Sequence, residues 1–190
     1  MAINSDALQM TLQVTNVLEK MGIQYAVGGS LSSSVHGMMR ATMDVDIVAD
    51  MHMEQVDGFV VAMSPYFYAD DEMIRDAILR KSSFNLIHLE TAYKVDVFIP
   101  KDRIFDRNQL ERRVLSSITS ESDKSIYVTS AEDIILSKLE WFRMGGEMSD
   151  RQWRDILGVI KMRDDELDTD YLLKMAKNLN VLDLLEKALK

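Results

Sequence analysis

A glycine pair followed by a serine is the first feature of this chain that suits chemistry on phosphates. Gly28, Gly29 and Ser30 stand between an apolar stretch typical of a strand and a stretch typical of a short helix. Two glycines let a ligand approach the backbone closely, and the free amides at the start of a helix favour an anion. Since Ser30 adds a hydroxyl group, this turn predicts a site for a phosphate.

Three aspartates predict a cation site in the same part of the protein. Asp44 and Asp46 lie two residues apart in a predicted strand, 44–49, so their carboxylates would project from one face. Asp96 lies in a second predicted strand, 93–99, where apolar residues alternate and a buried carboxylate is costly unless it is paired or bound to metal. Three such aspartates could hold two Mg²⁺ ions, the arrangement that serves in-line displacement at phosphorus.

Each of these features also has a purely structural explanation. A Gly-Gly pair usually forms a plain turn, and Asp96 could lie on a wet face of a sheet. The Asp-x-Asp pattern recurs at Asp168 and Asp170, where helix capping explains it. The order of strand, glycine turn, helix and Asp-x-Asp strand nevertheless favours a common site.

Other uses of the acidic pair conflict with the neighbouring residues. An EF-hand loop beginning at Asp44 needs glycine at its sixth position and glutamate at its twelfth, where Ala49 and Gln55 stand. An aspartate-nucleophile phosphatase carries the pair at the end of a hydrophobic strand, whereas here the β-forming residues follow it. The three histidines have no zinc-like spacing and cysteine is absent, so the sequence predicts no zinc site.

Taken together, the glycine turn, the Asp-x-Asp pair and the later strand aspartate resemble the nucleotidyltransferase superfamily, which includes DNA polymerase β and the antibiotic nucleotidyltransferases. The narrower resemblance is to small bacterial AbiEii-type and lincosamide-type nucleotidyltransferases, and it covers about residues 5–160. It is carried by His36-Gly37-x-x-Arg40-x-Thr42-x-Asp44-x-Asp46-Ile47, Ser130-x-Glu132-Asp133, Lys138-Leu139 and Arg154-Asp155-Ile156.

The resemblance implies a metal-dependent enzyme that moves a nucleoside monophosphate from a nucleoside triphosphate, ATP by family habit, to an acceptor hydroxyl. Asp44 and Asp46 would bind the Mg²⁺ ions that hold the triphosphate, and Asp96 would bind the second ion and help to activate the acceptor. The implied contacts with the triphosphate are Gly28, Gly29, Ser30, Arg40 and Lys138. Of these, Arg40 and Lys138 could equally be solvated surface residues.

The acceptor stays open: a small molecule, a protein side chain or an RNA end. The alternative function is that of a catalytically silent, nucleotidyltransferase-like module that binds a nucleotide or a partner.

The elements that must position these residues predict an α/β (α+β) fold, a mixed sheet flanked by helices and followed by a helical segment. We expect a nucleotidyltransferase-like core over residues 1–129 and a C-terminal helical segment, packed on this core, over 130–190. Trp141, Phe142 and Trp153 fit helix packing better than a base-stacking surface. Predicted strands cover 23–27, 44–49, 83–89, 93–99 and 126–128, and predicted helices cover 5–21, 30–38, 53–63, 70–80, 106–115, 131–144, 150–162, 169–178 and 181–189.

Composition narrows the function classes further. A chain of 190 residues is long enough for one globular unit, with two small subdomains as the alternative. The absence of cysteine excludes disulfides, and with no signal peptide or membrane span in the sequence we expect a cytoplasmic protein that does not enter a membrane. A net charge of −9 disfavours extended binding to nucleic acid. A homodimer or a regulatory partner remains open.

Overall fold

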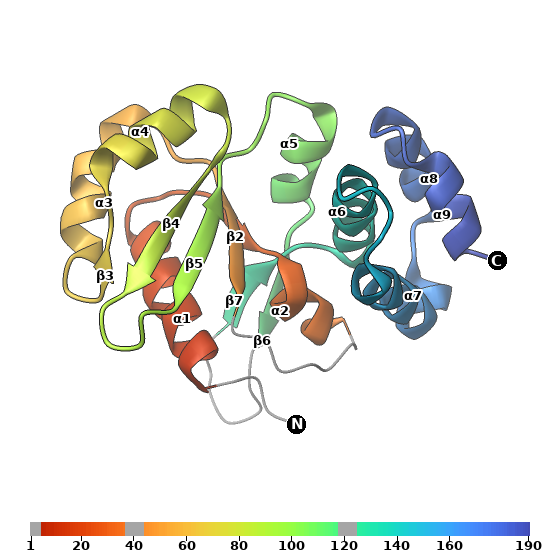
Figure 1. The fold of residues 1–190 in the computed structure, drawn as a ribbon, viewed down its shortest axis with the longest axis horizontal. Helices are drawn as coiled ribbons and strands as arrows, with labels where there is room; N and C mark the ends of the chain where they lie inside the picture. The colour runs from red at the N-terminus through yellow and green to blue at the C-terminus, as the bar shows by residue number, and fades with distance from the viewer. Residues whose placement is uncertain (1–4, 37–43, 118–124) are drawn as a thin grey trace.

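A mixed sheet of seven strands forms the centre of the protein (Figure 1). The computed structural model describes residues 5–36, 44–117 and 125–190. The strand order is β3-β4-β5-β2-β1-β7-β6. Two pairs are parallel, β2 with β5 and β1 with β7, and the other neighbours are antiparallel. The strands are β1 Tyr25–Val27, β2 Val45–Ala49, β3 Phe67–Tyr68, β4 Ser83–His88, β5 Lys94–Phe98, β6 Val114–Ser117 and β7 Ser125–Val128.

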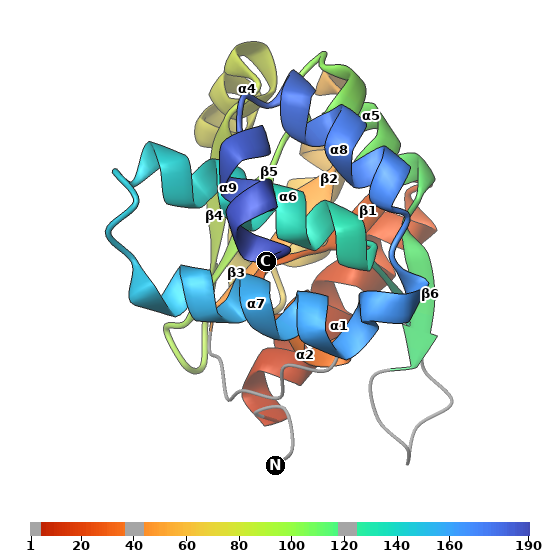
Figure 2. The ribbon, with the colours of Figure 1, turned by 90° about the vertical axis from the view of Figure 1, so that its right-hand side faces the viewer.

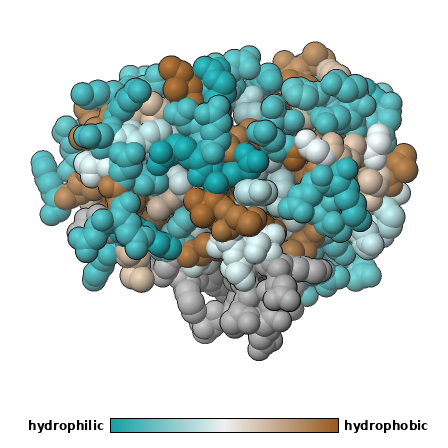
Figure 3. Space-filling model, turned by 180° about the vertical axis from the view of Figure 1, so that it is seen from behind, coloured by the Kyte–Doolittle hydropathy of each residue, from teal (hydrophilic) through white to brown (hydrophobic). Residues whose placement is uncertain are grey.

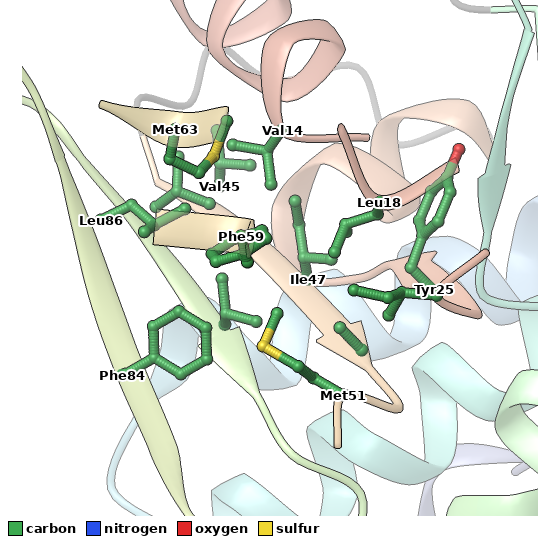
Figure 4. Packing of buried hydrophobic residues seen from close by; sticks show 14 of the residues in the cluster. Val14, Leu18, Tyr25, Val45, Ile47, Met51, Phe59, Met63, Phe84 and Leu86 are labelled. Atoms are coloured by element: carbon green, nitrogen blue, oxygen red, sulfur yellow. The ribbon is translucent and has the colours of Figure 1, made fainter. Parts of the chain in front are cut away.

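One face of the sheet is buried under three helices (Figure 1): α1 Ser5–Lys20, α3 Val56–Met63 and α4 Asp71–Arg80. Alternate residues of the central strands, such as Val45 and Ile47 of β2, point into this layer and are fully buried. Figure 4 shows them packed against Phe59 of α3 and Leu18 of α1. The strict alternation along β2 and β5 therefore fixes which side chains remain for the opposite face.

The opposite face carries α2 Gly29–Val35 and α5 Ile104–Glu111, and then the C-terminal helices (Figures 1 and 2). Figure 2 shows α6 Ala131–Met144 running across the strands, with α7 Asp150–Arg163 below it. The last helices, α8 Thr169–Asn178 and α9 Leu182–Ala188, pack against α6, and all four helices share a second hydrophobic cluster that also includes Phe105 of α5. Two short 3₁₀ turns complete the elements, Met53–Gln55 and Asp164–Glu166.

The predicted α/β fold class is confirmed, but one predicted element is wrong. The predicted helix 106–115 ends at Glu111, and Val114 and Leu115 belong to strand β6. The reason is tertiary: β6 pairs antiparallel with β7, with Leu115 opposite Tyr127, and this pairing overrides the local helical pattern. The two-residue strand β3 was too short to be predicted from periodicity.

Seen from behind (Figure 3), the face is mostly hydrophilic, with a hydrophobic group near its centre. In the described ranges no helix has both the length and the apolar character that a membrane crossing requires.

Candidate active site

Asp46 and Asp96 lie side by side on the sheet face opposite the hydrophobic layer of Figure 4. The parallel register of β2 and β5 sets Asp46 directly opposite Asp96. Their neighbours along the strands, such as Val45 and Val95, are fully buried on the other face. Because adjacent strands are about 4.8 Å apart, the two carboxylates are held within interaction range by the backbone itself.

Asn85 of β4 extends this polar row and was not predicted. It lies opposite Asp96 in the antiparallel β4–β5 pair, and its Nδ2 donates a hydrogen bond to Asp96 Oδ1. Its strand position between the buried residues Phe84 and Leu86 is the signal that could have placed it on this face. This hydrogen bond orients the Asp96 carboxylate, because one of its two oxygens accepts from the Asn85 amide.

The glycine turn is built around Asp46. The N–H of Gly28 donates to the Asp46 carbonyl oxygen over 2.8 Å, which continues the β1–β2 pairing beyond the end of β1. Gly29 has a φ of +55°, and a Cβ there would lie 1.8 Å from Asp46 Oδ2 and 3.1 Å from Asp46 Cβ. Both the backbone conformation and the space beside it therefore require glycine, and the Asp46 carboxylate lies against the turn.

Hydrogen bonds anchor the helix that follows the turn to the start of α6. Ser32 Oγ lies 2.8 Å from Thr129 Oγ1, and His36 Nε2 lies 2.7 Å from the Thr129 carbonyl oxygen. Burial lowers the pKa of His36, which suits a neutral ring that donates to this carbonyl. Ser30 lies in the first turn of α2, and its carbonyl accepts from Ser34. The turn is thus fixed with respect to α6.

The charges of this face are unbalanced at Asp46. Burial, together with the negative charges of Asp96 and Asp44, raises the pKa of Asp46 to about 6, against smaller opposing effects of Lys138 and Lys94. A carboxylate with this pKa gains from any cation that joins it. Asp44 lies just before β2 and is exposed, with Arg151 of α7 at 4.0 Å.

The donor set suits a divalent cation in type and charge. Three carboxylates, Asp44, Asp46 and Asp96, interact electrostatically on one face, and oxygen donors of this kind are those that Mg²⁺ accepts. Over residues 5–36, 44–117 and 125–190, no three histidine or carboxylate side chains are already grouped as a metal cage.

The two basic residues expected at the triphosphate have different outcomes. Lys138 of α6 forms a buried ion pair with Asp155 of α7, with Nζ 3.0 Å from Oδ2. It is nevertheless close enough to Asp46 to lower the pKa of that acid. Arg40 lies outside the described residues. A cation that was not predicted, Lys94, lies 3.7 Å from Asp96 Oδ1.

Three aromatic residues were expected to pack between helices, and Trp141 does not follow this expectation. Phe142 and Trp153 do pack together, with ring centroids 5.3 Å apart. Trp141 is 50% exposed, and its ring meets Phe98 of β5 at 6.1 Å, edge to face. Trp141 therefore lies on the sheet face that carries the acids rather than in the C-terminal core.

Solved structures share this fold. A nucleotidyltransferase-like antigenic protein from Paracoccidioides brasiliensis is 17% identical, with a TM-score of 0.57 over 100% of this chain and 94% of its own. The lincosamide antibiotic adenylyltransferase LnuA, with lincomycin bound, is 16% identical, with a TM-score of 0.52 over 85% of this chain and 99% of its own. A Thermotoga maritima protein assigned as a nucleotidyltransferase is 17% identical, with a TM-score of 0.52 over 80% and 95%.

These likenesses show the nucleotidyltransferase fold. No family model matches the sequence, and no curated protein matches it.

Proposed function

We propose that this protein is a metal-dependent nucleotidyltransferase that transfers a nucleoside monophosphate from a nucleoside triphosphate to an acceptor hydroxyl. The observation that supports it most is the in-register pairing of Asp46 with Asp96, with the main chain of Gly29 packed against the Asp46 carboxylate. Two carboxylates held together beside a glycine turn suit a cation that is shared with a phosphate group. The fold agrees with this proposal.

In the proposed reaction, the acceptor oxygen attacks the α-phosphorus of the triphosphate. The bond from this phosphorus to the oxygen that bridges to the β-phosphate breaks, and pyrophosphate leaves with the electron pair. Asp96 would receive the acceptor proton, and the hydrogen bond from Asn85 keeps its carboxylate oriented. When bound, Mg²⁺ would neutralise the triphosphate and stabilise the charge of the transition state.

The remaining residues would hold the triphosphate. Asp44 and Asp46 would hold the cations that the triphosphate shares, and the turn at Gly28, Gly29 and Ser30 would lie along the terminal phosphates. Lys138 is engaged with Asp155, so a direct contact with phosphate would require it to exchange partners.

The resemblance adds three finer expectations. Arg40 would be a further phosphate contact, and ATP would be the donor. The protein would be akin to the AbiEii-type and lincosamide-type nucleotidyltransferases that its motifs resemble.

A silent binding module is the second candidate function. It is favoured by the absence of a preformed metal cage among the described residues and by Arg151 lying beside Asp44. In this alternative, the ionic contacts of the acids are structural, and the protein binds a nucleotide or a partner without turnover.

Release of pyrophosphate distinguishes the two functions. The purified protein is incubated with each nucleoside triphosphate, with Mg²⁺ or Mn²⁺, and with a cell extract as the source of acceptors. We expect release that falls by orders of magnitude in Asp96→Asn, while Mg²⁺-dependent binding of the triphosphate, measured by calorimetry, is largely kept.

The matched control is Asp102→Asn, which removes an exposed carboxylate that lies 3.8 Å from Lys81 and is not part of the acidic row. Release that survives in Asp96→Asn contradicts the catalytic role of that residue. Binding without release under every combination of nucleotide and metal supports the silent module instead.

A further inference from the structure

The aromatic pair formed by Trp141 and Phe98 lies next to the acidic row. Phe98 follows Asp96 by two residues on β5, so both side chains are on the same face, about 6.7 Å apart along the strand. Phe98 is opposite Ser83 on one neighbouring strand and Val48 on the other. Of these three cross-strand neighbours, Phe98 alone is aromatic. The face therefore changes from acidic to apolar within one alternate position.

The helix above this face shows the same change. Lys138 and Trp141 are three residues apart on α6 and so lie on one side of the helix. Lys138 acts on the pKa of Asp46, whereas Trp141 contacts Phe98. A cation beside the acids and an aromatic ring one turn further along match a ligand that has an anionic end and a flat apolar end.

The indole of Trp141 has surface available for such a ligand. Half of the residue is exposed, although large aromatic residues in this chain such as Phe59 and Phe84 are fully buried. The planes of Trp141 and Phe98 are inclined at 69°, so the contact between the rings is edge to face and not a stack. An aromatic ring held in this way provides a stacking surface for a planar ring, and such stacking accepts any base.

We propose that Trp141, supported by Phe98, is the stacking surface for the nucleobase of the bound nucleotide. This inference rests on the proposed function, because the triphosphate places the base. With the phosphates at the glycine turn and the α-phosphate between Asp46 and Asp96, the base lies over the Phe98 position. Stacking on indole selects a nucleotide over its bare polyphosphate but does not discriminate strongly among bases.

Fluorescence of Trp141 provides the direct test. The chain has two tryptophans, so Trp153→Phe leaves Trp141 as the only indole. Trp153 is a suitable residue to replace, because it packs against Phe142 and contacts Lys187 in the C-terminal helices. We titrate this protein in Mg²⁺ with α,β-methylene-ATP, which cannot be cleaved at the reacting bond, and in parallel with inorganic tripolyphosphate. We expect the methylene analogue to quench the indole and tripolyphosphate to leave it unchanged.

Calorimetry of variants gives the second readout. Trp141→Ala should weaken binding of the methylene analogue about tenfold and leave tripolyphosphate binding unchanged, and Trp141→Phe should recover part of the loss. A general effect on folding would weaken the binding of both ligands together. Trp153→Phe serves as the matched aromatic control.

The outcomes separate this inference from the proposed function. If both ligands bind with Mg²⁺ but the indole is not quenched, and Trp141→Ala binds the analogue normally, the stacking surface is overturned and the nucleotidyltransferase proposal stands. If neither ligand binds, the proposed function is refuted and the inference falls with it.

Discussion

Replacement of Gly29 by alanine should destabilise the protein through Asp46. Two costs add at this position. A φ of +55° costs an L-residue about 1–2 kcal/mol, and the new Cβ would meet Asp46 Oδ2 at 1.8 Å and Asp46 Cβ at 3.1 Å. Rotation of the Asp46 side chain relieves the contact with Oδ2 but not the contact with Cβ, so the backbone must also shift. This shift costs about 1–3 kcal/mol more. We expect Gly29→Ala to lower the free energy of unfolding by about 3 kcal/mol.

Gly22 offers a matched control for this effect. Its φ is +67°, and nothing lies within 4 Å of a Cβ placed there, so Gly22→Ala measures the conformational cost alone. In an Asp46→Gly background, which removes the Asp46 Cβ together with the carboxylate, the penalty of Gly29→Ala should fall to that of Gly22→Ala, about 1–2 kcal/mol. Urea unfolding of the four variants and the native protein gives these free energies.

The same experiment connects the turn with function. Since the Asp46 carboxylate must rotate away from its position, Gly29→Ala should also abolish Mg²⁺-dependent binding of the triphosphate, whereas Gly22→Ala should bind normally. A Gly29→Ala cost no larger than that of Gly22→Ala, or a cost that persists without the Asp46 side chain, would refute the reasoning.

Three further predictions concern buried charge. The pKa of Asp46 in the folded protein, about 6, lies above its ordinary value, so ionised Asp46 opposes folding above pH 6 and ceases to do so at about pH 3–4. Asp46→Asn should therefore stabilise the protein by about 1–3 kcal/mol at pH 8 and by little at pH 4. Urea unfolding at both pH values measures this difference. Burial raises the pKa of Asp133 to about 6 although Tyr171 donates to it over 2.7 Å, so Tyr171→Phe should raise that pKa further and cost about 1–2 kcal/mol at pH 8 and less at pH 5; an equal cost at both pH values would contradict this. Lys138→Met leaves Asp155 buried without its ammonium and should cost about 3–5 kcal/mol, and a second change, Asp155→Leu, should recover most of the loss, as thermal unfolding would show.

Alternation along single strands was enough to predict which acids share a face. Val95 and Val97 point into the core, so Asp96 must point away from it, and the same pattern fixes Asp46. The register between β2 and β5 was not predictable, because these strands are far apart in the sequence and nothing local specifies a parallel pairing. The position of Asn85 depends instead on the register of the β4–β5 pair, which sets it opposite Asp96.

Other parts of the site depend on long-range packing. The sequence suggested that Gly29 is needed so that a ligand can approach the backbone. In the structure a Cβ at this position would first meet the carboxylate of Asp46, which belongs to another element. The partnership of Lys138 with Asp155 and the exposure of Trp141 depend on how α6 lies against α7 and the sheet. Helical periodicity places residues on a side of the helix but does not say what that side meets.

The pairing of β1 with β7 bears on the order in which the two sides of the candidate site form, the acidic row on the sheet and the surface of α6 above it. Val27 pairs with Val128, so about a hundred residues must be closed into a loop before this contact forms. The β1–β2 and β4–β5 pairs join segments much closer in sequence and can form earlier. The β2–β5 pair, which sets Asp46 opposite Asp96, closes about fifty residues, half the separation of the β1–β7 pair. We therefore expect the acidic row to assemble before the surface that carries Lys138 and Trp141 is added to it.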